Sequence, residues 1–181
     1  MSPPAGRRPD VRRERFEQLF DDHFQLVTAY ALRRANQAEA EDAVAETFTV
    51  AWRRLDELSG DPKPWLLGVA RRVLANQRRA AGRNSALTEL LARERTADED
   101  PVEPPTILQA LVCLSEKNRE ALLLQAWEGL SIAEIAAALG CSPSAAKLRL
   151  HRGRRQLRAE LERLERADPS LTSEPGLKET T

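Results

Sequence analysis

The chain has 181 residues, of which 41% are hydrophobic and 31% charged, and its 28 basic and 28 acidic residues give no formal net charge. A chain of this length can bury one or two small cores, and two cysteines are too few for a disulfide framework. The N-terminus has no apolar signal segment and no run is long enough to span a bilayer, so we expect a cytoplasmic protein with no membrane contact of its own.

Positive and negative charges are separated along the sequence. Residues 36–61 hold seven acids and two arginines, whereas residues 62–83 hold five arginines and one lysine without an acid. Residues 84–106 are acidic again, with six acids and two arginines. Such blocks indicate separate surfaces that meet separate partners.

The first predicted helical zone covers residues 16–31. Its apolar residues recur at intervals of three and four, which puts them on one side of one helix or of two nearly continuous helices. They are Phe16, Leu19, Phe20, Phe24, Val27, Tyr30 and Ala31. No segment of the chain alternates as a strand does.

The second zone, residues 38–58, predicts an amphipathic helix with an acidic outer face. Its inward positions are Val44, Phe48, Ala51, Trp52 and Leu55. Its outward positions are Glu41, Asp42, Glu46, Thr49 and Arg53. From spacing alone, this face is an ordinary solvent-exposed surface. The three tryptophans, Trp52, Trp65 and Trp127, are expected in the core because aromatic residues of that size dominate small cores.

The third zone, residues 61–80, is predicted to begin with Asp61 as a cap, followed by prolines in the first turn. One half of this helix is apolar and consists of Trp65, Leu66, Val69, Ala70, Val73 and Leu74. On the other half, small Gly68 and Ala75 lie between two basic edges, Arg71 with Arg78 and Arg72 with Arg79. Two rows of guanidinium groups predict binding to a polyanion.

Residues 82–105 lose the helical periodicity and end in the run "DEDPVEPP". This composition predicts a flexible acidic linker between two domains. Fully extended, it reaches about 75 Å, enough for the two domains to sit on distant parts of one partner. The last residues, 165–181, predict a disordered tail.

Residues 115–158 predict a helix-turn-helix. Ser115 is expected to cap one helix, and Ser131 with Glu134 forms a capping box at the start of the next. Gly140 ends that helix, and Ser142 followed by Pro143 begins another.

The inner sides of the last two of these helices are apolar. They pair Ile132, Ile135, Ala136 and Leu139 with Ala146, Leu150, Gly153 and Leu157. The free arc of the last helix carries Ser144, Leu148, His151, Arg152 and Arg155, flanked by Lys147, Arg149, Arg154 and Arg158. Small and basic groups on such an arc suit the major groove of DNA.

Three motifs, in this order, resemble the extracytoplasmic-function (ECF) group of bacterial sigma-70 RNA polymerase sigma factors. They are residues 39–55 ("EAEDAVAETFTVAWRRL"), residues 64–80 ("PWLLGVARRVLANQRRA") and residues 114–158, which contain the helix-turn-helix. The similarity runs from Arg15 to Leu164. It implies an all-α protein of two small helical domains joined by a flexible linker. Residues 12–81 would dock on core polymerase and melt the promoter −10 element, and residues 106–164 would read the −35 element.

The resemblance also implies site residues, position by position. The polymerase-binding set, which would meet the clamp helices, is Glu41, Asp42, Glu46, Thr49 and Arg53. The set for the single-stranded −10 element, behind a base-capturing loop at residues 58–63, is Lys63, Arg71, Arg72, Asn76, Arg78 and Arg79. The set for the duplex −35 element is Ser142, Ser144, Ala145, Lys147, Leu148, Arg149, His151, Arg152 and Arg155. An anti-sigma factor is the further partner that the resemblance implies.

The sequence departs from the family pattern at four of these helical positions. Ala45 replaces a frequent Gln in the docking helix, and Arg72 and Asn76 replace Asn and Asp, which makes the single-strand face more basic. Leu148 stands where a small polar residue is common. Its central place on the free arc leads to the hypothesis that it touches a thymine methyl group.

Three alternative classes of protein fit the sequence less well. A helix-turn-helix transcriptional regulator that is not a polymerase subunit has no need of four arginines on the exposed half of residues 64–80. A pure interaction protein that sequesters a partner would not direct transcription from promoters. The sequence has no paired carboxylates in apolar settings, nucleophile motif, phosphate loop or metal-ligand spacing, so we expect no catalysis, metal, cofactor or small-molecule substrate.

Overall fold

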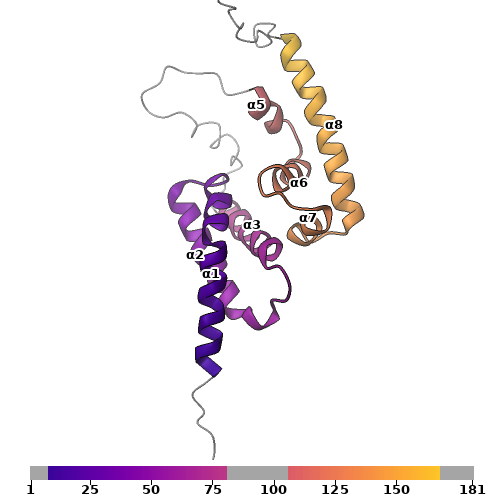
Figure 1. Cartoon of the computed structure of the whole chain (residues 1–181). Coiled ribbons are helices and arrows are strands. Elements are labelled where there is room, and N and C mark those ends of the chain that lie inside the picture. The colour runs from indigo at the N-terminus through magenta and orange to yellow at the C-terminus, as the bar shows by residue number, and fades with distance from the viewer. Residues whose placement is uncertain (1–7, 81–105, 168–181) are drawn as a thin grey trace, which may run out of the picture.

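The computed structural model describes residues 8–80 and 106–167, and all their regular elements are helical (Figure 1). The N-terminal domain contains α1 (Arg8–Leu32), α2 (Gln37–Arg53), a 3-10 turn η1 (Leu55–Glu57) and α3 (Lys63–Ala80). The C-terminal domain contains α5 (Thr106–Val112), α6 (Glu116–Ala126), α7 (Ile132–Leu139) and α8 (Pro143–Ala167). The all-α prediction is confirmed. The predicted linker, residues 82–105, lies outside the described residues.

The N-terminal domain folds around the apolar faces that the spacing predicts. Its first zone is one continuous helix, α1, rather than two. Phe20 of α1 lies 4.7 Å from Phe48 of α2 between ring centroids, and Tyr30, Leu66 and Leu67 are fully buried. Packing three amphipathic helices against one another therefore fixes which side of α2 and α3 remains outside.

Side-chain hydrogen bonds cap the N-termini of α2 and α3. Asn36, which the sequence analysis did not single out, forms a capping box with Glu39 at the start of α2. The predicted cap before α3 is confirmed, because Asp61 Oδ1 accepts a hydrogen bond of 2.9 Å from the Lys63 backbone amide. Each cap satisfies an amide that the first helical turn leaves without a partner.

The capping box and the turn predicted for the helix-turn-helix are confirmed. Glu134 accepts from the Ser131 amide at 2.7 Å, and Gly140 has a φ of 60°, the left-handed conformation that glycine adopts without strain. The Ser142 hydroxyl accepts from the Ala145 amide at 3.2 Å at the start of α8. The cap predicted at Ser115 is wrong in one respect. Its hydroxyl caps nothing, because the Asn118 amide bonds the Ser115 carbonyl instead.

The predicted inner side of the helix-turn-helix is largely confirmed. Ile135, Ala136, Ala146 and Leu150 are buried, whereas Ile132 is exposed. Gly153 lets α8 approach α6, because a Cβ atom there would lie 3.0 Å from the Leu122 side chain. Residues 165–167, assigned above to the tail, continue α8, the helix against which α5 packs.

Two tryptophans predicted for the core are exposed instead. Trp52 and Trp127 are 39% and 40% exposed, and a guanidinium covers each ring, from Arg12 at 5.0 Å and from Arg33 at 5.5 Å. Cation–π contact stabilises an aromatic ring at the surface. Trp65 is half-buried and packs against the core, so the prediction holds for it only in part.

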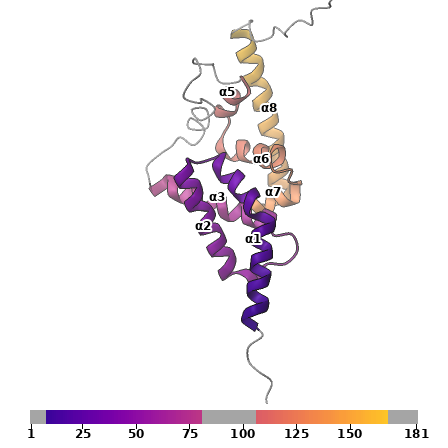
Figure 2. The ribbon, with the colours of Figure 1, turned by 60° about the vertical axis from the view of Figure 1, so that its left-hand side comes forward.

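The two domains pack against each other, with α7 beside α3 (Figures 1 and 2). Gly68 of α3 is buried at this contact, and a Cβ atom on it would lie 3.0 Å from the Ala138 carbonyl oxygen of α7. The small residue expected to leave room for a polyanion is therefore covered by a helix of the other domain. No helix in residues 8–80 or 106–167 has both the length and the apolarity needed to cross a membrane.

We predict that Gly68→Leu separates the two domains without unfolding either. A leucine side chain cannot fit against the Ala138 backbone, so α7 must move away from α3. Small-angle scattering should report a larger radius of gyration than in the wild type, with helix content unchanged by circular dichroism. The matched control is Ala159→Leu at an exposed position of α8. An unchanged radius of gyration for Gly68→Leu would show that the contact does not hold the domains together.

Candidate nucleic-acid and polymerase interfaces

The acidic face of α2 is exposed along its length. All five residues of the predicted polymerase-binding set are exposed: Glu41, Asp42, Glu46, Thr49 and Arg53. The opposite side of the helix is buried through Ala43, Val44, Thr47, Phe48 and Ala51. The structure therefore brings the predicted set together on one accessible surface of the N-terminal domain.

The predicted −10 set is divided by the docking of the C-terminal domain. Arg72, Asn76 and Arg79 are exposed on α3, where Arg79 donates a hydrogen bond to the Asn76 side chain. Lys63 instead donates to the Glu128 carbonyl of the other domain at 2.6 Å. Arg71 and Arg78, both half-buried, line a pocket between the domains.

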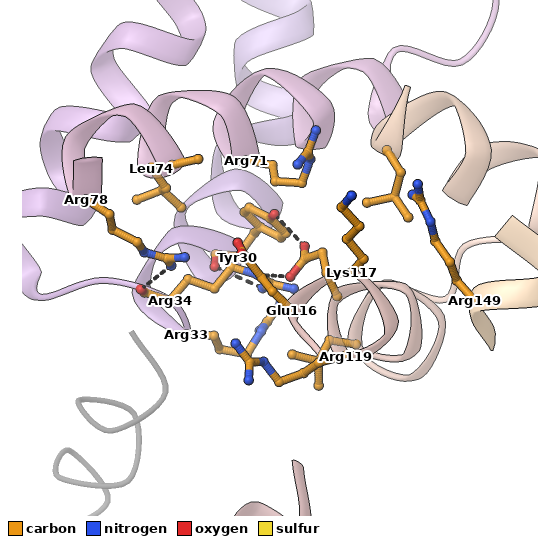
Figure 3. Close-up of a pocket in the computed structure, with 14 residues that line it drawn as sticks. Tyr30, Arg33, Arg34, Arg71, Leu74, Arg78, Glu116, Lys117, Arg119 and Arg149 are labelled. Carbon is orange, nitrogen blue, oxygen red and sulfur yellow. Dashed lines mark hydrogen bonds and ion pairs between the residues drawn. The ribbon is translucent and has the colours of Figure 1, made fainter. Parts of the chain in front are cut away.

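The two domains are joined by a cluster of buried charges, here called the interdomain ion cluster. Its members are Tyr30, Arg33 and Arg34 of α1 and the turn after it, Glu120 of α6, and Glu128. The Tyr30 hydroxyl donates to Glu120 at 2.8 Å, and Arg34 Nε donates to the same carboxylate at 3.2 Å (Figure 3).

A second carboxylate of the cluster, that of Glu128, is bound by Arg33. Arg33 donates to Glu128 at 2.6 Å, and Arg34 lies 3.6 Å from the same carboxylate. The Arg34 side chain is 7% exposed and that of Glu128 1%, so neither charge is compensated by water. Each depends on a partner from the other domain, because an unpaired buried charge is strongly destabilising.

The cluster shifts the pKa values of its members. Burial raises the pKa of Tyr30 well above its ordinary value, and the neighbouring Glu120 carboxylate adds to this while Arg34 opposes it. Burial disfavours the ionised form of Glu120, but Arg34 and the Tyr30 hydroxyl outweigh it and keep the pKa of Glu120 below its ordinary value. The cluster therefore contains an ionised carboxylate, a cation and a neutral phenol at neutral pH.

Sequence reasoning missed this cluster. Arg33 and Arg34 follow a helix, where cations are common, and Glu120 and Glu128 lie in or just after the helix expected to begin at Ser115. A signal existed in the two acids among the apolar residues of 120–130. Periodicity shows that an acidic residue interrupts an apolar segment, but it does not show which residue of the other domain that acid contacts.

The predicted −35 set gathers on one side of α8. Ser142, Ser144, Lys147, Leu148, His151, Arg152 and Arg155 are exposed. Leu148 is 46% exposed. Ala145 and Arg149 are half-buried, and Arg149 donates to Cys141 Sγ at 3.4 Å and lines the interdomain pocket. Most of this face is thus accessible while the domains are docked.

The described ranges offer no metal centre. They contain no group of three or more His, Cys, Asp or Glu side chains that could hold an ion. Cys113 and Cys141 are free thiols.

Both halves of the chain match models of known protein families. The family model described as "Sigma-70 region 2" matches residues 19–84, and the one described as "Sigma-70, region 4" matches residues 106–157. The first covers α2 and α3 with the polymerase-binding and −10 sets, and the second covers the helix-turn-helix.

Relatives with similar sequences support the same family. RNA polymerase sigma factor CarQ of Myxococcus xanthus is 37% identical over 168 residues, which cover 86% of this chain and 94% of the relative. ECF RNA polymerase sigma factor SigL of Mycobacterium tuberculosis is 32% identical, over 81% of this chain and 88% of the relative.

Solved structures are similar as well. The sigma factor RpoE of Bartonella quintana, in complex with the anti-sigma factor NepR, has a TM-score of 0.60 and 26% identity, covering 81% of this chain and 96% of that one. CnrH, in complex with the cytosolic domain of CnrY, has a TM-score of 0.59 and 30% identity, covering 84% of this chain and 88% of that one.

Tyr30 is the only tyrosine in the sequence, so its titration reports on the ion cluster directly. We predict that the phenol of the wild type titrates well above its ordinary pKa, and that Gly68→Leu moves this pKa back toward the ordinary value. Because docking raises the pKa of Tyr30, the neutral phenol favours the docked state. This contribution is fully present below the ordinary phenol pKa and is lost as the pH rises through the pKa of the docked state. Ultraviolet difference absorbance of the phenolate measures this. An ordinary pKa in the wild type would contradict the docked arrangement.

Proposed function

Because this chain belongs to the ECF group of sigma-70 RNA polymerase sigma factors, we propose that its two helical domains divide promoter recognition between them. As a sigma factor it is a non-catalytic subunit that binds core RNA polymerase and promoter DNA and directs transcription initiation. Family membership also sets aside the alternative of a regulator that is not a polymerase subunit. What remains to propose is which surface performs each task.

We assign polymerase docking to the exposed face of α2. Glu41, Asp42 and Glu46 present three carboxylates on one side of a helix that the core packing holds rigid. Carboxylates attract basic partner surfaces and steer association. This face is accessible in the docked arrangement, so polymerase can bind before the domains separate.

We assign the −10 element to α3 and residues 58–63. Single strands are held by cationic grooves along the backbone and by pockets that accept unstacked bases. Arg72, Asn76 and Arg79 are available for this at once. Lys63, Arg71 and Arg78 become available only when the C-terminal domain moves away from α3.

We assign the −35 element to the exposed arc of α8, with α7 as its support. Small and basic residues along one side of a capped helix fit the major groove, where arginine reads guanine and apolar groups contact thymine methyl groups. On this proposal residues 12–81 form the polymerase and −10 domain and residues 106–164 the −35 domain.

The two DNA-binding faces act together only on the polymerase. Each offers about six cations, and phosphate contacts weaken steeply with salt, so neither holds a promoter firmly by itself. Mounting both domains on one enzyme makes the second contact effectively intramolecular. Since the similar sigma factor RpoE was solved in complex with the anti-sigma factor NepR, we propose such a partner here, and a cytoplasmic location beside the polymerase.

The observation that carries this division is that α3 and α8, from separate domains, each present exposed cations on one face. Run-off transcription with purified core polymerase on a genomic fragment library tests it. Promoter-specific transcripts should appear only when this protein is added. Transcripts that do not depend on it, or tight and specific binding of duplex promoter by the free protein at moderate salt, would contradict the proposal.

Reversing charge on α2 tests the docking face. Glu46→Arg should weaken core polymerase binding about tenfold, because one favourable contact is replaced by repulsion. Fluorescence anisotropy of the labelled protein against core polymerase measures the affinity. Asp21→Arg, at an exposed position of α1, is the matched control and should bind as the wild type does. Equal affinity for Glu46→Arg and the control would place the docking surface elsewhere.

Leu148 tests the −35 assignment. If its side chain contacts a thymine methyl group, Leu148→Ser should reduce discrimination among −35 variants by about fourfold, the effect of exposing about one methyl-sized group. Transcription by the reconstituted holoenzyme from a set of −35 variants measures this. Ile107→Ser, at another exposed apolar position, should leave the preferences intact. Unchanged discrimination in Leu148→Ser would contradict the hypothesis that Leu148 contacts a thymine methyl group.

A further inference from the structure

A cationic cavity of about 310 Å³ lies between the two domains (Figure 3). The N-terminal domain contributes Arg33, Arg34, Arg71 and Arg78 to its walls, and the C-terminal domain contributes Lys117, Arg119 and Arg149. Only two acids line it, Glu116 and Glu120, and Glu120 is already paired with Arg34 and Tyr30. Even with Glu128, which pairs with Arg33 and Arg34 from outside the walls, the cavity has an excess of positive charge, and that charge comes from both domains.

Three nitrogen atoms of the wall arginines lack a hydrogen-bond acceptor within the part of the chain that the structure describes. Among the described residues, Arg33 Nε, Arg34 Nη2 and Arg71 Nε are shielded from solvent and bond to no acceptor. Buried donors of this kind are rare in native proteins, and each one costs stability. Burial lowers the pKa of Arg119, and the nearby Arg78 adds to this, although Glu116 and Glu120 oppose it.

We propose that this cavity binds a small phosphate-bearing anion, either inorganic pyrophosphate or the phosphates of a nucleotide, and that the bound anion holds the two domains docked. Guanidinium groups match phosphate oxygens through paired hydrogen bonds. The volume is at the small end of the range for ligand pockets. An anion of several charges would supply the acceptors and the negative charge that the walls lack.

The position of the cavity gives binding a regulatory consequence. Its two walls separate when the domains do, so the complete site exists only in the docked arrangement. A ligand that binds one state alone multiplies the ratio of that state to the other by 1 + [L]/Kd. Because Arg71 and Arg78 belong to both the cavity and the predicted −10 set, the anion opposes promoter binding. The existence of the site itself does not depend on the proposed DNA roles.

Isothermal titration of the full chain with pyrophosphate tests the proposal, with sodium sulfate at equal ionic strength as the control anion. We expect one saturable site for pyrophosphate and none for sulfate. Parallel titration with adenosine diphosphate distinguishes the two sources. If adenosine diphosphate binds more tightly than pyrophosphate, the natural ligand is a nucleotide. If it binds equally or more weakly, the natural ligand is free pyrophosphate. No saturable binding of either ligand, or equal binding of sulfate, would overturn the proposal.

Two sets of variants locate the site. Lys117→Gln, an exposed wall residue outside the polymerase and DNA sets, should weaken binding about threefold, and Lys117→Gln with Arg119→Gln about tenfold. Arg158→Gln with Arg166→Gln on the exposed side of α8 is the matched double control and should bind normally. Gly68→Leu, which separates the walls, should abolish tight binding. Unchanged affinity in Gly68→Leu or in the Lys117 and Arg119 double variant would overturn the proposal.

Discussion

The burial of paired charges between the two domains is the interaction on which the rest of the structure depends. Arg34 and Glu128 are almost completely removed from water, and each finds a partner across the interface. Removing one partner of such a pair typically costs about 3–5 kcal/mol, yet the pair itself contributes little net stability, because both charges lose hydration. When the domains separate, all these groups return to water together. An interface of this kind is specific without being permanent, which suits the proposal that the protein opens in order to bind a promoter.

One helix links this interface to function. The cationic half of α3 is expected to hold single-stranded DNA, and the same half carries Gly68 and Arg71 against the C-terminal domain. Docking and full −10 binding therefore compete for one surface. The acidic face of α2 takes no part in this competition and remains exposed. On the proposed site roles, polymerase would bind the docked protein, separate its domains, and only then present both DNA-binding faces to a promoter.

Local features of the fold followed from the sequence because local interactions determine them. Periodicity predicted the buried faces of α1, α2 and α3, and side-chain chemistry predicted the capping box at Ser131 and the left-handed turn at Gly140. The resemblance to sigma factors predicted the family. The missed capping box at Asn36 and the absent hydroxyl cap at Ser115 are local, but the larger errors and omissions come from contact between distant positions. Arg12 covers Trp52 from 40 positions away, and Tyr30 meets Glu120 across 90. No spacing rule connects such residues, so the ion cluster and the division of the −10 set emerged only from the structure.

The distance between the two domains is the measurement that tests this account most directly. Cys113 is exposed in the C-terminal domain, and Gln18→Cys adds an exposed position in α1, so two spin labels can be placed once Cys141 is replaced by alanine. Double electron–electron resonance should give one short distance in the free protein and a longer one in the complex with core polymerase and promoter DNA. The same short distance in an active promoter complex would contradict the claim that docking and promoter opening exclude each other.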